Sequence, residues 1–262
     1  TDSAITLGGI SASDFENKKV KTSNLSGTKL TFGTYSITDK KFTTEATFTF
    51  PTSYEKKLDG GKTETVTIDY TASSDKIVEQ LNEALDSQGF LGKDGKSGIK
   101  FTLNGDKIQI SQTDSITDKG KSCVIRETSS ALKSLGFNSG NMKQDDIDNG
   151  ISLDEFNGHT SSLEAAAITK QSLSGYLKGK SISVSYGGQT KNIELIGDKE
   201  EIKDFEAFKD SLQKKLDKAF GSGKVTVGKG KDSKGSLTFT ATDSRQTLQI
   251  SADSKELQNA LG

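Results

Sequence analysis

The sequence predicts an α+β fold: two tandem, related domains, each a mostly antiparallel sheet with one long helix packed on it. Two amphipathic helical segments lie far apart in the 262-residue chain, and strand-like runs of alternating apolar and polar residues follow each of them. The tripeptide Thr-Asp-Ser closes one such run at Thr113–Ser115 and another at Thr242–Ser244. A helix that covers one face of an antiparallel sheet accounts for both periodicities.

The two helical segments carry the clearest periodic signal. Over residues 73–87 apolar residues recur at helical spacing, a serine stands at the start as N-cap, and Gly89 follows the end. Over residues 204–220 the spacing returns, with an aspartate as N-cap and Gly221 beyond the end. At one fixed offset the apolar positions coincide: Ile77 with Phe208, Leu81 with Leu212, and Leu85 with Leu216.

Each long helix is followed by three predicted strands and a short helix. In the first copy Asn104-Gly105 has the residues of a tight two-residue hairpin turn. The first copy places its strands at 99–103, 107–113 and 122–126 and its short helix at 129–135. The second copy places them at 224–227, 237–242, 247–251 and 254–261.

The segments upstream of the helices also agree. Leu-Ser-Gly precedes a predicted strand at 29–32 and again at 180–186, and strands at 63–70 and 191–195 lead into the two helices. The first copy is longer, which predicts an insertion from Ile37 to Gly61. We therefore expect a first domain over residues 1–148 that includes the N-terminal segment, a linker over 149–172, and a second domain over 173–262.

Composition restricts the class of protein. The hydrophobic fraction of 31% and the mean hydropathy of -0.57 favour two small cores over one large core. Lys and Arg number 35 against 36 for Asp and Glu, with both signs interspersed, so no nucleic-acid or membrane partner is expected. The chain has no initiator Met and no signal-peptide pattern, and we expect it to be a fragment of a longer protein.

An ordered set of segments carries a family resemblance. The second copy reads "GKSISVSYGGQTKNIEL", "LQKKLDKAF" and "GSLTFTATDS", and the first reads "DKIVEQLNEAL" and "IKFTLNGDKIQISQTDS". In this order they resemble the repeated module in the outer domains of flagellar hook-associated proteins, above all the filament cap family, hook-associated protein 2. The junction "NMKQDDIDNGISLDEFNG" is similar to the linker between the two outer domains of that family.

The resemblance implies a structural and assembly protein, not an enzyme, with no cofactor. It implies an extracellular protein of the bacterial flagellum, secreted without a cleaved signal, that forms a homo-oligomer at the filament tip and supports flagellin polymerisation in motility. Its partners would be further copies of itself and flagellin. In that family, assembly depends on terminal coiled-coil helices of the full-length protein, and this chain lacks them.

Three alternatives stay open at this point. The chain could be the variable outer region of flagellin or of another hook-associated protein. It could be a cell-adhesion module that binds a host surface glycan or mucin, for which an exposed aromatic face would be needed. An enzyme is the poorest reading, because it would require a deep pocket with convergent carboxylates.

We expect no catalytic, cofactor-binding or metal-binding residue. The stretch 145–156 resembles a calcium loop, but Ile147 and Phe156 stand where carboxylates are needed, so an acidic linker docked by its apolar residues is preferred. His159 is the single histidine, which excludes a histidine cluster. Cys123 lies in a strand pattern and is expected to be a small buried apolar residue.

Exposed interaction loops are the expected functional features. A Gly-rich loop over 221–235 is locally basic, and a few aromatic residues lie in polar surroundings of the first copy. For the fragment itself we expect a monomer or a weak oligomer, because no large apolar patch is predicted. The candidate residues are Lys224, Lys229, Lys231 and Lys234, together with Tyr35, Phe42, Tyr54 and, for glycan binding, Tyr70.

Overall fold

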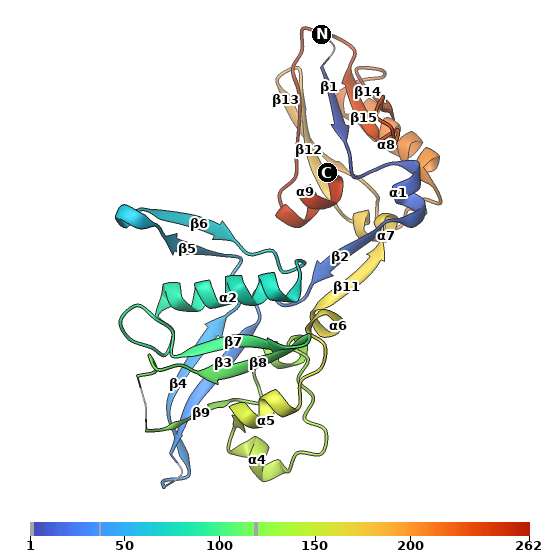
Figure 1. Cartoon of the computed structure of the whole chain (residues 1–262). Coiled ribbons are helices and arrows are strands. Elements are labelled where there is room, and N and C mark those ends of the chain that lie inside the picture. The colour runs from blue at the N-terminus through green and yellow to red at the C-terminus, as the bar shows by residue number, and fades with distance from the viewer. Residues whose placement is uncertain (1–2, 37, 118–119) are drawn as a thin grey trace. The chain divides into compact units, whose positions relative to one another are not determined.

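The computed structural model describes residues 3–36, 38–117 and 120–262. The fold is mixed α+β with several antiparallel sheets. The chain divides into two compact units (Figure 1), one made of Thr1–Lys21 with Lys170–Gly262 and the other of Thr22–Thr169. We call them the split unit and the inserted unit. Each has its own apolar core, so the small apolar content serves two cores, as expected.

This division differs from the predicted one at both ends of the first domain. The N-terminal strand β1 (Ala4–Leu7) pairs with β15 (Leu237–Ala241), and Leu7 and Ile10 are buried in the core of the split unit. Residues 149–169, predicted as linker, belong to the inserted unit. One unit therefore interrupts the sequence of the other, and β2 (Lys19–Ser23) and β11 (Ile168–Ser172), at the two crossings, pair with each other.

The main sheet of the inserted unit is built around β3 (Lys29–Ser36). This strand lies between β4 (Lys41–Thr49) and β9 (Ser122–Ile125), and β10 (Ile151–Ser152) pairs with the far side of β9. Leu30, Phe32 and Thr34 are buried because every second residue of β3 faces the core. On the other face Gly33 leaves room for an aromatic ring, since a Cβ there would lie 2.4 Å from Cδ1 of Phe42.

The long helix α2 (Ser74–Gln88) completes the core of the inserted unit. Ser73 accepts a hydrogen bond from the Lys76 amide at its start, and Gly89 adopts φ +58° at its end, as the sequence predicts. It lies between β5 (Ser53–Lys57) and β7 (Ile99–Asn104), and it packs on both strands (Figure 1). Its buried face meets the rings of Phe48, Phe50 and Phe101 in one cluster.

The hairpin of β7 with β8 (Lys107–Gln112) turns one residue later than predicted. Asn104 pairs with Lys107, so Gly105 and Asp106 form the turn, and Gly105 has φ +62°. A glycine in the first turn position with positive φ fits a type II′ turn. The Asp106 carboxylate accepts hydrogen bonds from the hydroxyls of Ser74 and Ser162 and, at 3.2 Å, from the Glu164 amide.

These contacts join the turn to the first residues of α2 and of α6 (Leu163–Ala167). Partial burial raises the pKa of the Asp106 carboxyl, but the hydrogen bonds outweigh it and the pKa is lowered. Three further short helices complete the inserted unit, α3 (Ala131–Ser134), α4 (Gln144–Asp148) and α5 (Leu153–Gly158).

The stretch predicted as an insertion, residues 37–61, contributes a strand to the core of the inserted unit. Residues 41–49 form β4, a core strand in register with β3, and Phe48 and Phe50 are fully buried. Ile37, where the insertion was expected to begin, lies outside the described residues. After β4 the chain forms a hairpin of β5 and β6 (Thr63–Thr67) with the 3-10 helix η1 (Asp59–Gly61) at its tip. We call these residues, 53–67, the exposed hairpin.

The split unit has two three-stranded sheets, ordered β1-β15-β14 and β13-β12-β16. Its strands are β12 (Ser181–Tyr186), β13 (Gln189–Glu194), β14 (Val225–Lys229) and β16 (Leu248–Ser251), with β1 and β15. The long helix α8 (Phe205–Phe220) begins at Asp204, whose carboxylate accepts the Ala207 amide hydrogen bond at 2.8 Å. Shorter helices are α1 (Ala12–Asn17), α7 (Leu173–Leu177) and α9 (Lys255–Leu261).

The N-terminal segment and α9 are held together by one lysine. Lys18 Nζ donates to the carbonyls of Gly9 at 2.9 Å and Ala260 at 2.7 Å, and the Gly9 amide donates to the Leu261 carbonyl at 2.8 Å. Burial lowers the pKa of Lys18, while the charge of Asp14 acts in the opposite direction. A cation at the end of α9 also complements the helix dipole.

Candidate functional site

The exposed hairpin contacts the core of the inserted unit only at its root, through Tyr54 and Val66. Residues 55–65 are all exposed, and Leu58 near the tip is 42% exposed. The register runs from Ser53 opposite Thr67 to Lys57 opposite Thr63, which corresponds to an arm of about 13 Å before the tip. An isolated two-stranded hairpin is marginally stable, so the root must be held by the rest of the unit.

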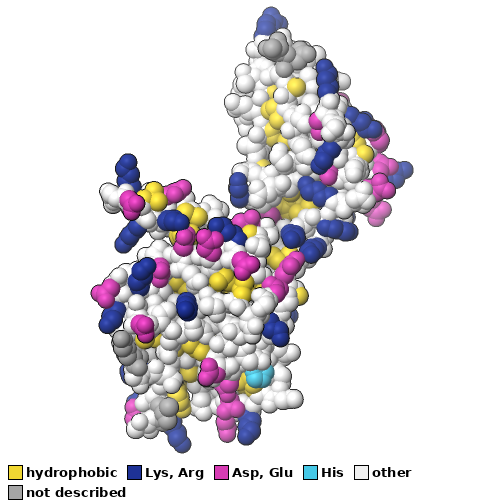
Figure 2. Space-filling view, in the orientation of Figure 1, with side chains coloured by type: hydrophobic (Ala, Val, Ile, Leu, Met, Phe, Trp, Pro, Cys, Tyr) yellow, Lys and Arg dark blue, Asp and Glu magenta, His cyan; other side chains and the backbone are white. Residues whose placement is uncertain are grey.

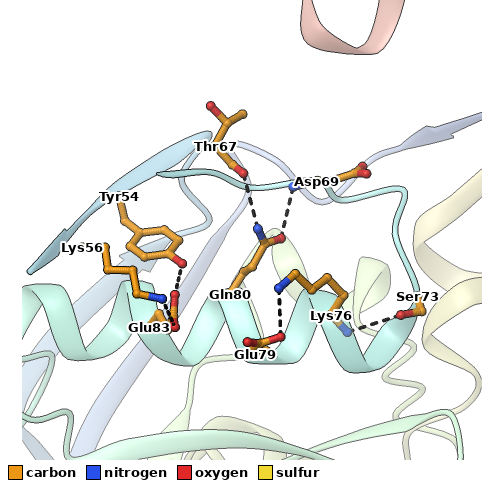
Figure 3. Close-up of polar contacts among 9 residues, drawn as sticks. All are labelled: Tyr54, Lys56, Thr67, Asp69, Ser73, Lys76, Glu79, Gln80 and Glu83. Carbon is orange, nitrogen blue, oxygen red and sulfur yellow. Dashed lines mark hydrogen bonds and ion pairs between the residues drawn. The ribbon is translucent and has the colours of Figure 1, made fainter. Parts of the chain in front are cut away.

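Helix α2 holds that root through polar contacts (Figure 3). The Tyr54 hydroxyl donates to Oε2 of Glu83, and Lys56 Nζ donates to Oε1 of the same carboxylate at 2.8 Å. One turn earlier Gln80 accepts from the Asp69 amide at 3.2 Å and donates to the Thr67 carbonyl at 3.4 Å.

The contacts at the root favour a charged Glu83 and a protonated Tyr54. The hydrogen bonds from Lys56 and then Tyr54 lower the pKa of the Glu83 carboxyl. Burial, and then the hydrogen bond to Glu83, raise the pKa of Tyr54, which therefore keeps its proton at neutral pH. A charged carboxylate that accepts two hydrogen bonds fits a role in anchoring β5 to α2.

A shallow cleft of about 220 Å³ lies beside this anchor. Ion pairs occupy its walls, since Lys96 lies 3.4 Å from Asp86 and Lys56 lies 2.8 Å from Glu83. Charges that already neutralise one another leave little net field for a charged ligand. Its lining consists of Tyr54, Glu55, Lys56, Lys57, Glu83, Asp86, Ser87, Gly95 and Lys96.

A second cleft, of about 360 Å³, lies in the split unit next to the loop that joins β13 to α8. Glu200 organises this loop. Its carboxylate accepts hydrogen bonds from the Gly197 amide at 2.6 Å, from Lys215 Nζ at 2.5 Å and from the Ser211 hydroxyl. Partial burial raises the pKa of Glu200, but these donors outweigh burial and bring the pKa to about 2.

The four predicted lysines do not form one patch. Lys224 precedes β14, whereas Lys229, Lys231 and Lys234 lie at or near the turn at its other end, about 17 Å along the strand. Two of the three turn lysines have acidic partners: Lys229 lies 2.9 Å from Glu206, and Lys234 lies 3.8 Å from Asp14. Positive and negative side chains are also interspersed over the face shown in Figure 2.

The turn that carries these lysines is ordered by an aspartate. Asp232 accepts hydrogen bonds from the Ser236 amide at 2.7 Å and from the Ser236 hydroxyl at 2.6 Å. The Gly235 amide donates to the Asp232 carbonyl at 3.0 Å. The basic loop is therefore a structured turn with partly neutralised charge.

The aromatic residues that the adhesin alternative would need on one exposed face are largely covered. Tyr54 and Tyr70 are each only 6% exposed, and Tyr54 lies on β5, which packs against α2, rather than in an exposed loop. The Tyr70 hydroxyl donates to the Pro51 carbonyl at 2.6 Å. The expectation that Tyr54 is exposed is therefore wrong, and Tyr70 cannot contribute to an exposed aromatic face, because both rings belong to the core of the inserted unit.

Tyr35 and Phe42 come together on the outer face of the main sheet. Their ring centroids are 5.7 Å apart, and the Arg126 guanidinium lies 4.1 Å from the centroid of Phe42. Arg126 also pairs with Glu45 at 2.6 Å. Both rings are half-buried, so neither is fully open to solvent.

The remaining candidates have structural roles. His159 Nδ1 lies 2.8 Å from the Glu155 carbonyl, and burial raises the pKa of Cys123 to about 12. In the predicted linker, Ile151 and Phe156 are buried in the core of the inserted unit, so docking of its apolar residues is confirmed for these two. Among the described residues, His, Cys, Asp and Glu form no group of three or more that could hold a metal ion.

Comparisons of the chain with protein-family models, with curated proteins and with solved structures gave no match. Within the three described ranges, the helices are too short or too polar to span a lipid bilayer.

Proposed function

We propose that the chain forms the outer domains of a flagellar filament cap, a structural protein that sits at the filament tip and supports flagellin polymerisation. The proposal has two parts. One is that a small helix-on-sheet module was duplicated, and the other is that the two copies act through surface contacts. The family resemblance of the sequence links these parts to flagellar hook-associated proteins.

One observation supports the duplication more than any other, namely the strand pairing inside each unit. In the split unit β12 lies between β13 and β16, and in the inserted unit β3 lies between β4 and β9. The hairpin β14–β15 follows α8, as the hairpin β7–β8 follows α2. Each long helix packs on the first strand of the hairpin after it.

In this proposal β4 is the counterpart of β13, and the exposed hairpin is an addition to the inserted copy. This assignment replaces the predicted match of residues 63–70 with residues 191–195, because β6 pairs with β5 and β13 pairs with β12. The copies are then nested, with the first inside the sequence of the second.

The proposed mode of action is binding by shape. The outward faces of the sheets carry Ser, Thr and mixed charges, and Leu58 is the exposed large apolar side chain in the described part of the chain. Surfaces of this kind associate through many modest polar contacts and trapped water. Stable assembly would then depend on additional contacts made elsewhere in a full-length protein.

The adhesin alternative has less support than before, because two of its four aromatic residues are buried. Tyr54 and Tyr70 are buried, and Tyr35 and Phe42 are half-buried. Glycan recognition by aromatic residues needs an open ring face, and the Arg126 guanidinium lies over the ring of Phe42.

Immunogold electron microscopy tests the proposed location. Antibodies raised against the purified chain are applied to intact cells of the bacterium that produces it, with a gene-deletion strain as control. The proposal expects gold particles at the free end of each flagellar filament. Labelling along the whole filament would instead identify a flagellin, and labelling at the hook junction another hook-associated protein. Labelling of the cell body alone would overturn the flagellar proposal in favour of an adhesin.

A further inference from the structure

The exposed hairpin carries two free strand edges. It forms a two-stranded sheet by itself, and in the described part of the chain no further strand pairs with β5 or β6. A strand edge presents backbone N–H and C=O groups that can template another strand. This edge is exposed over residues 55–65, so it is accessible in the inserted unit.

The hydrogen bonds at both ends of the hairpin show which groups face outward. The Leu58 amide donates to the Lys62 carbonyl at 2.8 Å, and the Ile68 amide donates to the Thr52 carbonyl at 2.9 Å. Antiparallel pairs alternate, so the even-numbered residues bond within the hairpin and the odd-numbered residues turn their backbone groups outward. The outward groups belong to Glu55 and Lys57 on one edge and to Thr63 and Thr65 on the other.

At the root of the hairpin, the outward backbone groups of the β6 edge already have hydrogen-bond partners. Gln80 of α2 holds the outward carbonyl of Thr67 and the outward amide of Asp69 (Figure 3). The open part of this edge is therefore limited to the stretch around Thr63 and Thr65. A partner strand must be short, and it must approach the outer half of the arm.

The side chains of the hairpin match a second copy placed in one orientation. Within the hairpin Tyr54 faces Val66, Glu55 faces Thr65, and Lys56 faces Glu64. The Thr65 hydroxyl donates to Oε1 of Glu55 at 2.5 Å. A copy that lies alongside with its tip in the same direction presents its β5 to this β6, and the same complementary pairs recur between chains.

The symmetric alternatives are less favourable. If β5 pairs with β5 of another copy about a two-fold axis, the axis passes beside one residue position. The residue at that position then faces the same residue of the other copy. Centring on Glu55 opposes two carboxylates, and centring on Lys56 opposes two ammonium groups at the axis, which offsets the two Glu55–Lys57 pairs on either side of it. Two β6 strands centred on Thr65 avoid like charges but place Glu64 opposite Val66, so no opposite charges face each other across the contact.

We propose that the exposed hairpin binds a second copy of this chain by head-to-tail strand addition, with β6 of one copy antiparallel to β5 of the next. The contact is small, so it is weak between free chains and becomes effective where copies are concentrated. It requires only the hairpin, and it can be right or wrong independently of the flagellar proposal. A head-to-tail contact forms rings or open chains, depending on the rotation between copies.

Disulfide cross-linking between single-cysteine chains tests the pairing. Lys57→Cys and Thr63→Cys are made separately in a Cys123→Ala background, so that no chain can cross-link its own hairpin. In the proposed register position 57 of one copy faces position 63 of the next, at a Cα separation of about 5.5 Å that a disulfide can bridge. The two purified variants are mixed, oxidised over a range of concentrations, and the linked peptides are identified by mass spectrometry.

The proposal expects the mixed 57–63 dimer to exceed both homodimers severalfold, with a yield that rises with concentration. Thr65→Pro in both chains is the matched control, because it removes an outward amide and spares the hydrogen bonds within the hairpin. In this control the mixed 57–63 dimer is expected no longer to exceed the two homodimers. Homodimers in statistical proportion, a dominant 57–57 or 63–63 product, or a yield unchanged by Thr65→Pro would each overturn the proposal.

Discussion

Replacement of Glu200 by Gln is expected to destabilise the split unit at neutral pH and to have little effect in strong acid. The carboxylate accepts hydrogen bonds from the Gly197 amide, the Ser211 hydroxyl and Lys215, and its pKa is about 2 instead of the ordinary 4.5. Folding therefore favours the ionised form. A group whose pKa is lowered by folding adds stability above its unfolded pKa and loses it as the pH falls.

The size of the effect follows from this difference in pKa. A fall from 4.5 to about 2 corresponds to an upper limit of about 3.4 kcal/mol. The side chain of Glu200 is 32% exposed, so solvent screening reduces the expected loss to about 1–2 kcal/mol at pH 7. The loss should shrink below pH 4.5, and about three quarters of it should be gone at pH 2.5.

Urea unfolding followed by far-ultraviolet circular dichroism at pH 7 and pH 2.5 measures this difference. Hydrogen exchange of peptides from both units at pH 7 shows whether the loss is confined to the split unit. Glu201→Gln, an exposed neighbour in the same loop, is the matched control. Three outcomes would contradict the assigned role of Glu200: Glu200→Gln as stable as the parent at pH 7, an equal loss in the control, or a loss that persists undiminished at pH 2.5.

Three further substitutions test packing and capping. Gly33→Ala should cost about 1–3 kcal/mol because its Cβ would lie 2.4 Å from Phe42, and a thermal-unfolding double-mutant cycle with Phe42→Leu should show a smaller cost in the leucine background. Asp106→Ala should cost about 2–3 kcal/mol and speed hydrogen exchange at the start of both α2 and α6; exchange raised in only one helix would contradict its joining role. Lys18→Met should cost about 1 kcal/mol and raise exchange in α9, whereas unchanged exchange there would show that the lysine contacts are dispensable.

The two long helices were predictable because apolar spacing and capping residues within the helix segment itself define them. The helix predicted at 73–87 lies at Ser74–Gln88, and the one predicted at 204–220 lies at Phe205–Phe220, each within a residue of its expected ends. Hydrophobic spacing and the capping residues define such segments without reference to the rest of the chain. The clustering of apolar residues into two cores was predictable from composition for a similar reason.

The pairing partners and the exposure of single residues were not predictable. The contact of Ala4 with Thr240 joins distant ends of the sequence, and no local pattern records which strand will be adjacent. Tyr54 has polar neighbours on both sides, yet it is buried because only one face of β5 meets α2. Lys224 is close in sequence to the turn lysines but lies at the other end of β14, because an extended strand advances about 3.3 Å with each residue.

The two ends of the inserted unit meet where the chain enters and leaves it. The amide of Asn24 donates to the carbonyl of Ala167 at 3.0 Å, next to the paired strands β2 and β11. A segment whose ends lie close together can be inserted into or removed from another domain, because a short connection is enough to rejoin the remaining chain. The inserted unit can therefore change in evolution while the fold of the split unit is retained. A chain that lacks residues 24–167 is expected still to fold.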